Sequence, residues 1–176
     1  MAKTRKMLGS ADAPYIVSLM RLIETQSKTT LANWCLNYAQ EFILPIYETR
    51  RPGDSRPRAA IDAARDWLAG KVKLPQVRQI ILNECHAAAR ELTADPVAQA
   101  AARTCGQAAA SIHTPTHALG LAFYGAAAIA YNMVGLDQSP EVYDRIAAQE
   151  CAKMEASLRA VSVENELNPA KINWNC

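Results

Sequence analysis

The sequence lacks the compact motifs that mark the common catalytic and cofactor sites. It has no CxxC pair, no Walker loop, no GxGxxG, GxSxG or HExxH segment, and no EF-hand or kinase signature. Without CxxC, a zinc knuckle and a thioredoxin-like redox motif are both excluded. The five cysteines are odd in number and widely spaced, and four fall in helical patterns, where we expect small, reduced core residues: Cys35, Cys85, Cys105 and Cys151, with Cys176 as the fifth.

The chain also lacks a marked excess of positive or negative charge. The net charge of +2 over 176 residues is too weak to indicate a nucleic-acid or membrane partner, and we predict neither. The first residues are basic, but no apolar segment follows them, so we expect no secretory signal and a cytoplasmic location. No charged residue lies between Arg103 and Asp137. This stretch is rich in Ala and Gly rather than Leu and Ile, which favours a buried central helix over a membrane span.

The periodicity predicts an all-α fold and one domain over residues 1–176. Nothing alternates strands with glycine turns, whereas Ala-rich segments of helical period dominate. We expect a bundle of about six to seven helices, with boundaries set by proline, glycine and capping residues. The first expected helix lies near 12–26, and the second runs from residue 29 or 30 to a kink or stop at Pro45. The next helices are expected at 56–69, 75–93 and 96–110, and another begins at residue 115. A long helix inside 136–168 follows, and residues 169–176 form an irregular tail.

Two helices carry ridges of small side chains. Ala or Gly recurs at every fourth position of each helix, and such ridges let helix axes approach closely. The short connection at 111–115 makes the two helices antiparallel neighbours, so we expect them to form the centre of the domain. The ridges are Ala98, Ala102, Gly106 and Ala110 in the first helix and Ala118, Ala122, Ala126 and Ala130 in the second.

Two of the chain's three histidines, His113 and His117, lie four residues apart. Helical spacing of this kind serves many zinc sites, but Thr114 and Pro115 form a helix-start pair between them. His113 is therefore expected outside the helix that His117 opens. His86 is the third imidazole, and nothing in the spacing requires the three rings to meet. We predict no metal ion and no cofactor.

Charged candidates lie on one helix and in one loop. Arg103 is the only formal charge in its helix after Asp95. A guanidinium in so apolar a helix needs a carboxylate partner or serves as an anion-binding group, and we favour an internal ion pair to Asp54, Glu84 or Asp62. The polar stretch 48–58 holds several arginines and could meet an acidic partner or a phosphate, or could be a solvated loop clamped by internal ion pairs. Its candidate residues are Asp54, Arg56 and Arg58.

Several segments, in order, resemble the Imm-five-like immunity proteins of bacterial polymorphic toxin systems. They include Asn33-Trp34-Cys35, Leu44 to Glu48, Asp54-Ser55-Arg56-Pro57-Arg58, Arg65-Asp66-Trp67, His86 to Arg90, Ala101-Ala102-Arg103 and the His113 to His117 segment. The resemblance covers roughly residues 30–135 and departs at Cys85, where a small residue such as alanine is expected. It implies an all-α fold and the neutralisation of a partner toxin.

Three functions are carried forward. The first is a non-enzymatic immunity protein that binds a cognate toxin. The second is a small-molecule-binding or metal-assisted enzyme that uses the three histidines with Asp54 and Arg103. The third is a self-associating module, a homodimer through the long C-terminal helix. No catalytic residue is assigned. The predicted binding residues are Asp54, Arg56, Arg58, His86, Arg103, His113 and His117.

Overall fold

The computed structural model describes residues 4–174, and this part of the chain is 71% helical, with seven continuous helical runs and no strand. The all-α prediction is confirmed. The runs are α1 (Pro14–Ile23); α2 (Lys28–Tyr38), η1 (Ala39–Ile43) and α3 (Leu44–Arg50); α4 (Arg56–Leu68); α5 (Leu74–Ile80), η2 (Ile81–Cys85) and α6 (His86–Glu91); α7 (Pro96–Ala110); η3 (Pro115–Leu119), η4 (Leu121–Gly125) and α8 (Ala126–Val134); and α9 (Pro140–Val161).

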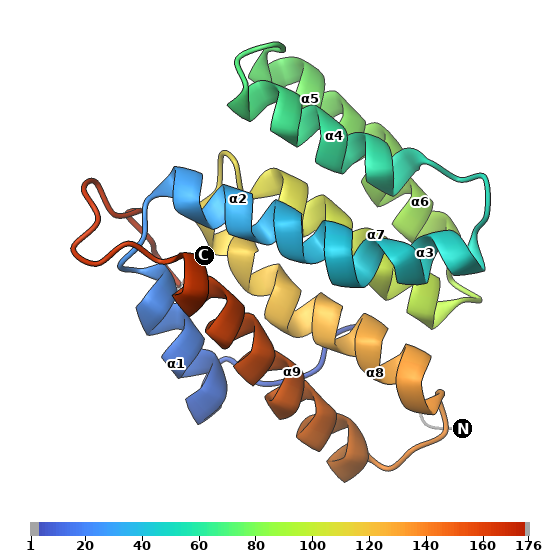
Figure 1. The fold of residues 1–176 in the computed structure, drawn as a ribbon. Coiled ribbons are helices and arrows are strands. Elements are labelled where there is room, and N and C mark those ends of the chain that lie inside the picture. The colour runs from blue at the N-terminus through green and yellow to red at the C-terminus, as the bar shows by residue number, and fades with distance from the viewer. Residues whose placement is uncertain (1–3, 175–176) are drawn as a thin grey trace.

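The helices form three groups around α7 (Figure 1). The first group is α4 with α5 and α6, the second is α2 and α3 beside α7, and the third is α8, α9 and α1. α7 contacts elements of all three groups, and it runs antiparallel to α8 as the small-residue ridges predict. Every member of both ridges is buried. The central position therefore follows from side chains that let neighbouring backbones approach closely.

Most helix boundaries have a local cause that the sequence reveals. The Asp95 carboxylate accepts a hydrogen bond from the Ala98 amide at 3.1 Å and so caps α7. Ser27 caps α2 through the Thr30 amide. Gly70 follows α4 with a φ of +73°, which glycine adopts without strain. The last helix spans Pro140–Val161 and is thus shorter than the predicted segment 136–168.

Pro45 does not end its helix, contrary to the prediction of a kink or stop. The chain passes through the π-helical segment η1 and continues as α3 to Arg50. Proline has no N–H to donate to the carbonyl four residues earlier, and the wider π turn just before it accommodates the missing bond. The polar loop is consequently shorter than residues 48–58, because its first residues are helical.

The apolar stretch before Asp137 forms the sixth helical run. Residues Pro115–Val134 are long and apolar enough to cross a membrane by length and composition, yet 61% of the most apolar window is buried among the other helices. Tyr131 and most of the small residues of this run pack inside the bundle, whereas Tyr124 is half-buried. Its environment is that of the buried central helix that the sequence favoured.

The apolar stripe of α9 is used inside the chain. From Tyr143 to Leu158 the stripe is buried against α1, α2 and α8, and only Val161 at its end is exposed. The residues after α9 dock as well: the Trp174 indole donates to Glu24 at 2.6 Å and the Ala170 amide donates to the Gln26 carbonyl at 2.8 Å. Most of the stripe that suggested a homodimer is thus used within the chain, and self-association through this helix stays a prediction.

Candidate functional site

The loop between α3 and α4 is held by a network of ion pairs. The Arg56 guanidinium binds the Asp54 carboxylate through two hydrogen bonds, of 2.9 and 2.8 Å, and binds Glu91 through two more, of 3.1 and 2.9 Å. Arg58 binds Glu48 in the same bidentate way, at 2.6 and 2.9 Å. Planar guanidinium–carboxylate pairs of this geometry are the most specific ion pairs that proteins form. These pairs tie the start of α4 to α3 through Glu48 and to α6 through Glu91.

A buried tyrosine completes the attachment of Asp54. The Tyr47 side chain is fully buried, and its hydroxyl donates to the Asp54 carboxylate at 2.7 Å. The hydrogen bonds from Arg56 and Tyr47 hold the pKa of Asp54 well below its usual range, while burial and the bond to Asp54 raise the pKa of Tyr47. Asp54 therefore remains ionised and fixed, and Tyr47 remains a neutral donor.

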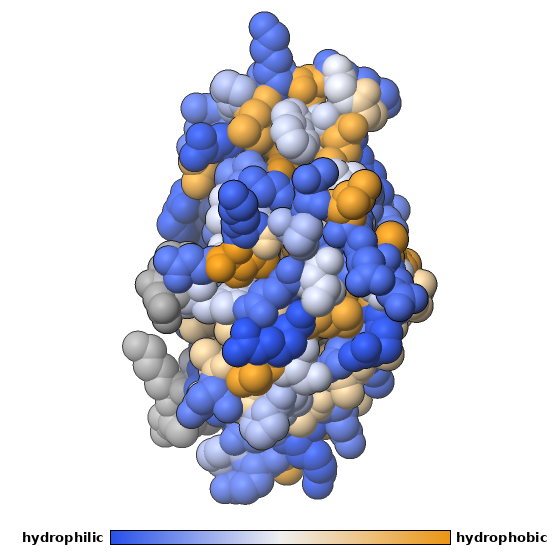
Figure 2. Space-filling view, turned by 90° about the vertical axis from the view of Figure 1, so that its left-hand side faces the viewer, coloured by the Kyte–Doolittle hydropathy of each residue, from blue (hydrophilic) through white to orange (hydrophobic). Residues whose placement is uncertain are grey.

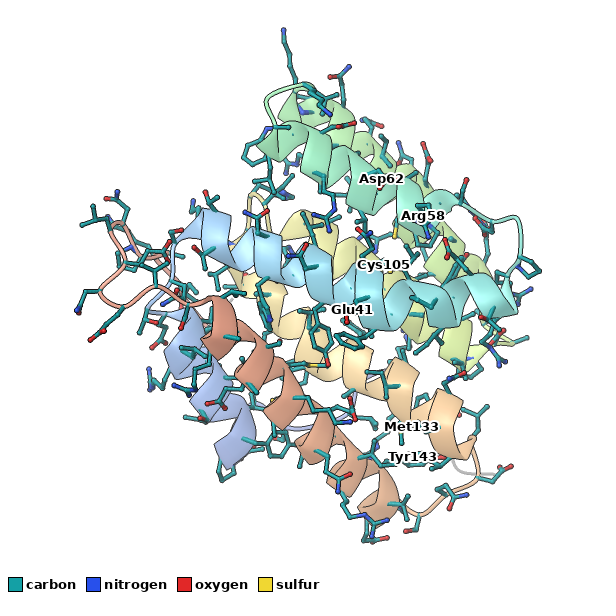
Figure 3. All side chains as sticks on the ribbon, viewed as in Figure 1. Glu41, Arg58, Asp62, Cys105, Met133 and Tyr143 are labelled. Atoms are coloured by element: carbon teal, nitrogen blue, oxygen red, sulfur yellow. The ribbon has the colours of Figure 1, made fainter. Side chains whose placement is uncertain are left out.

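The two arginines at the end of α3, Arg50 and Arg51, are also paired. Arg50 lies 2.9 Å and Arg51 3.6 Å from the carboxylate of Asp95, the residue that caps α7. We call this set the arginine clamp. It comprises Glu48, Arg50, Arg51, Asp54, Arg56, Arg58, Glu91 and Asp95. Each arginine of the clamp has a carboxylate partner within the chain, so the clamp balances its own charges, and the one buried polar atom it leaves without a hydrogen bond among the described residues is the Nε of Arg51. Figure 3 shows Arg58 on α4 beside this loop, one turn before Asp62.

The three histidines converge, which their spacing did not require. His86, His113 and His117 line one cavity of about 270 Å³, together with Arg78, Leu82 and the last turn of α7. The ring centroids of His113 and His117 lie 6.3 Å apart. The predicted helix boundary is confirmed: His113 lies in the turn after α7 and His117 lies in η3. The two rings meet through the turn and not along one helix face.

Each imidazole has a different environment. His117 donates through Nδ1 to the Gln107 side-chain carbonyl, whereas the Nδ1 of His113 is buried without a hydrogen-bond partner. Burial lowers the pKa of all three histidines, and the neighbouring guanidinium groups of Arg90 and Arg78 lower those of His86 and His113 further. The rings are therefore kept neutral at pH 7.

Two glycines leave room for side chains at the histidine cavity: Gly106 for His86, and Gly120 for Gln107, the partner of His117. A Cβ at Gly106 would lie 2.5 Å from the His86 ring, and a Cβ at Gly120 would lie 2.6 Å from the Gln107 side chain. Both distances are far below van der Waals contact. The ridge glycine of α7 thus serves the placement of an imidazole, in addition to the close approach of helices.

Arg103 has no carboxylate partner among residues 4–174, so the expectation of an internal ion pair to Asp54, Asp62 or Glu84 is wrong. Its guanidinium lies over the Tyr124 ring, 5.8 Å from the centroid. The side chain is half-buried and reaches the surface, where no counter-ion is needed because water reaches it. There it lines a cavity of about 470 Å³ with Arg5, Lys6 and Arg90.

The cysteines are core residues, as predicted for the helical ones. Cys35, Cys85, Cys105 and Cys151 are free and buried, and Cys176 lies outside the described residues. Burial raises the pKa of Cys85 to about 12 and that of Cys105 well above its ordinary value. The Cys85 thiol donates to the Ala102 carbonyl. A thiolate nucleophile is disfavoured at both positions. Figure 3 shows Cys105 in the interior of the bundle.

Most of the chain matches one known protein family. The family model described as "Imm-5 like putative immunity protein" matches residues 21–157. The chain belongs to this family. The match includes the arginine clamp, the histidine cavity and Arg103, and it extends beyond the resemblance over residues 30–135 into α1 and α9. No curated protein and no solved structure matches the chain.

The predicted binding residues of this family member divide between two places. Asp54, Arg56 and Arg58 lie in the arginine clamp. The other four line two cavities: His86 lies on α6, Arg103 on α7, His113 in the turn after α7 and His117 in η3. Sequence reasoning missed Arg78 and Arg90. These residues follow one face of the run 74–91, at steps of four residues through Leu82 and His86. That spacing was a usable signal.

Proposed function

We propose that this protein is an immunity protein that binds a cognate toxin and blocks it without catalysis. The match to the immunity-protein family over residues 21–157 carries the proposal. The location expected from the sequence, the cytoplasm, is proposed as the place where the two proteins meet. Binding of this kind is stoichiometric, so it needs a stable surface and no reactive group.

The rigidity of the bundle supports such a role. The ion-paired loop, the docked tail and the buried small-residue centre hold the exposed side chains in fixed places, and a preformed surface loses less entropy on association. A stable complex buries about 800 Å² on each partner. Figure 2 shows one face on which hydrophobic residues are separated by hydrophilic ones, so this face offers polar rather than apolar contacts.

A small-ligand or metal-assisted site is the second candidate, because the three imidazoles line one cavity and His113 has an unpaired buried nitrogen. Two observations weigh against it. Asp54 belongs to the clamp and not to this cavity, and Arg78 brings a positive charge to the place where a cation would bind. No group of three potential metal ligands with suitable geometry is found within residues 4–174. Elemental analysis of the purified protein tests the metal.

Co-expression with a candidate toxin, such as the product of a neighbouring gene, tests the lead proposal. We expect the chain to restore growth of cells that express the toxin and to elute with it as one complex from a size-exclusion column. Persistent toxicity, with the two proteins eluting separately, would contradict the proposal. An inactive toxin variant that keeps its surface serves as the binding partner when the active toxin cannot be produced.

A further inference from the structure

One face of the molecule gathers cationic and imidazole side chains around three cavities. The first cavity has Arg103 on its wall, the second is the histidine cavity, and the third, of about 470 Å³, shares His117 and Thr114 with the second. The Tyr124 ring under Arg103 also lines the third cavity, so all three adjoin. We call this surface the basic face. Its positive and imidazole groups are Arg5, Lys6, Arg78, Arg90, Arg103, His86, His113 and His117.

No carboxylate residue is found in the walls of these cavities. The three linings, taken from the described residues, contain no Asp and no Glu. Arg78, Arg90 and Arg103 make no ion pair within residues 4–174, and the one hydrogen bond of Arg90 to this part of the chain is a long one of 3.4 Å to the Leu82 carbonyl. Within the described part of the chain, Arg5 is the one cation of this surface with a counter-ion, Asp144 at 2.8 Å.

The charges of this face act on one another. Arg90 and Arg103 both oppose protonation of His86, and Arg78 opposes protonation of His113. Like charges held this close repel, and the low net charge of the chain shows that this concentration is local. A bound anion would relieve the repulsion. The third cavity adds apolar wall from Met20, Phe123 and Trp174, which suits the hydrophobic side chains of a protein partner.

We propose that the basic face is the surface that receives carboxylate side chains from an acidic segment of the toxin. Arginine binds carboxylates bidentately and is enriched at protein interfaces. The cations are spread along three adjoining cavities and not gathered in one, which fits a chain segment with several carboxylates better than one small anion. This inference rests on the proposed function and adds the site and the chemistry of the partner.

The first test needs no toxin. A fluorescent hexaglutamate peptide is titrated with the full chain at low ionic strength, where surface charges are least screened. The wild-type protein should bind it, and the variant Arg78→Glu/Arg90→Glu should bind at least fivefold more weakly. The control is Arg145→Glu, an exposed arginine of α9 that lines none of the three cavities. Equal binding by the wild type and the double variant would overturn the inference, as would preference for tripolyphosphate over the peptide.

The second test uses the toxin. The double variant should bind it at least tenfold more weakly than the wild type, and raising the salt concentration should narrow this difference. The control Arg145→Glu should bind as the wild type does. If both variants bind like the wild type, the basic face is not the toxin site, while the proposed function stands. If the wild-type chain itself does not bind, the proposed function fails. Circular dichroism verifies that each variant is folded.

Discussion

The arginine clamp and the basic face use the same residue type in opposite ways. In the clamp, four arginines meet four carboxylates of the same chain, and the geometry is bidentate for Arg56 and Arg58. On the basic face, Arg78, Arg90 and Arg103 have no carboxylate partner within the described residues. A satisfied ion pair has little left to offer a partner, whereas an unpaired cation does. The clamp therefore serves stability, and the basic face is available for binding.

The largest expected effect is on the clamp. Asp54→Ala removes a partner of Arg56 and leaves the buried Tyr47 hydroxyl without its acceptor. We expect the free energy of unfolding to fall by about 2–3 kcal/mol, measured by urea denaturation. Asp62→Ala on the exposed side of α4 is the matched control and should change it by less than about 0.5 kcal/mol. Equal effects of the two variants would show that the clamp does not stabilise the fold.

A second variant tests the contact between α7 and the His86 ring, at the histidine cavity. In Gly106→Ala, the new Cβ would lie 2.5 Å from the His86 ring, so the ring or the helix must move. Overpacking of this kind should lower the free energy of unfolding by about 2 kcal/mol. In a double-mutant cycle with His86→Ala, the two effects should be strongly non-additive. Additive effects would mean that the imidazole does not pack against α7 as described.

The pH dependence of stability sharpens the contrast. Burial lowers the pKa values of His86, His113 and His117 below 6.5 in the folded chain, and nearby guanidinium groups lower those of His86 and His113 further. The unfolded chain therefore binds more protons below about pH 6.5, so the free energy of unfolding should fall as the pH decreases from 7 to 5. Carboxylates titrate mostly below this window. His113→Asn should flatten the dependence, and an unchanged profile would contradict the assigned environment.

The smallest expected effect on stability is on the basic face. Arg90 is exposed and has no ion pair, so Arg90→Gln should change the free energy of unfolding by no more than about 0.5 kcal/mol. Urea denaturation of Arg90→Gln and of Arg56→Gln compares their free energies of unfolding directly. Arg56→Gln removes the bidentate contacts to both Asp54 and Glu91. A large loss in Arg90→Gln would show that this arginine has a structural partner.

The sequence predicts most of the fold for identifiable reasons. Capping residues, prolines and the small-residue ridges place Asp95, Ser139 and Pro115 at or near observed helix boundaries and put α7 at the centre. Pro45 was misjudged, because a π turn can absorb a proline and no one-dimensional pattern reveals it. The pairing of Arg56 with Glu91 and the meeting of His86 with His117 depend on how helices cross. Such contacts are set by tertiary packing.

The affinity of the toxin for two single variants tests the division of roles most directly. Arg90→Gln alters the basic face and Arg58→Gln alters the clamp, and each removes one positive charge from an exposed side chain. Isothermal titration calorimetry with an inactive toxin variant should show weaker binding for Arg90→Gln alone, with wild-type affinity for Arg58→Gln once its folded fraction is taken into account. Weaker binding for Arg58→Gln alone would contradict the account and place the toxin on the clamp.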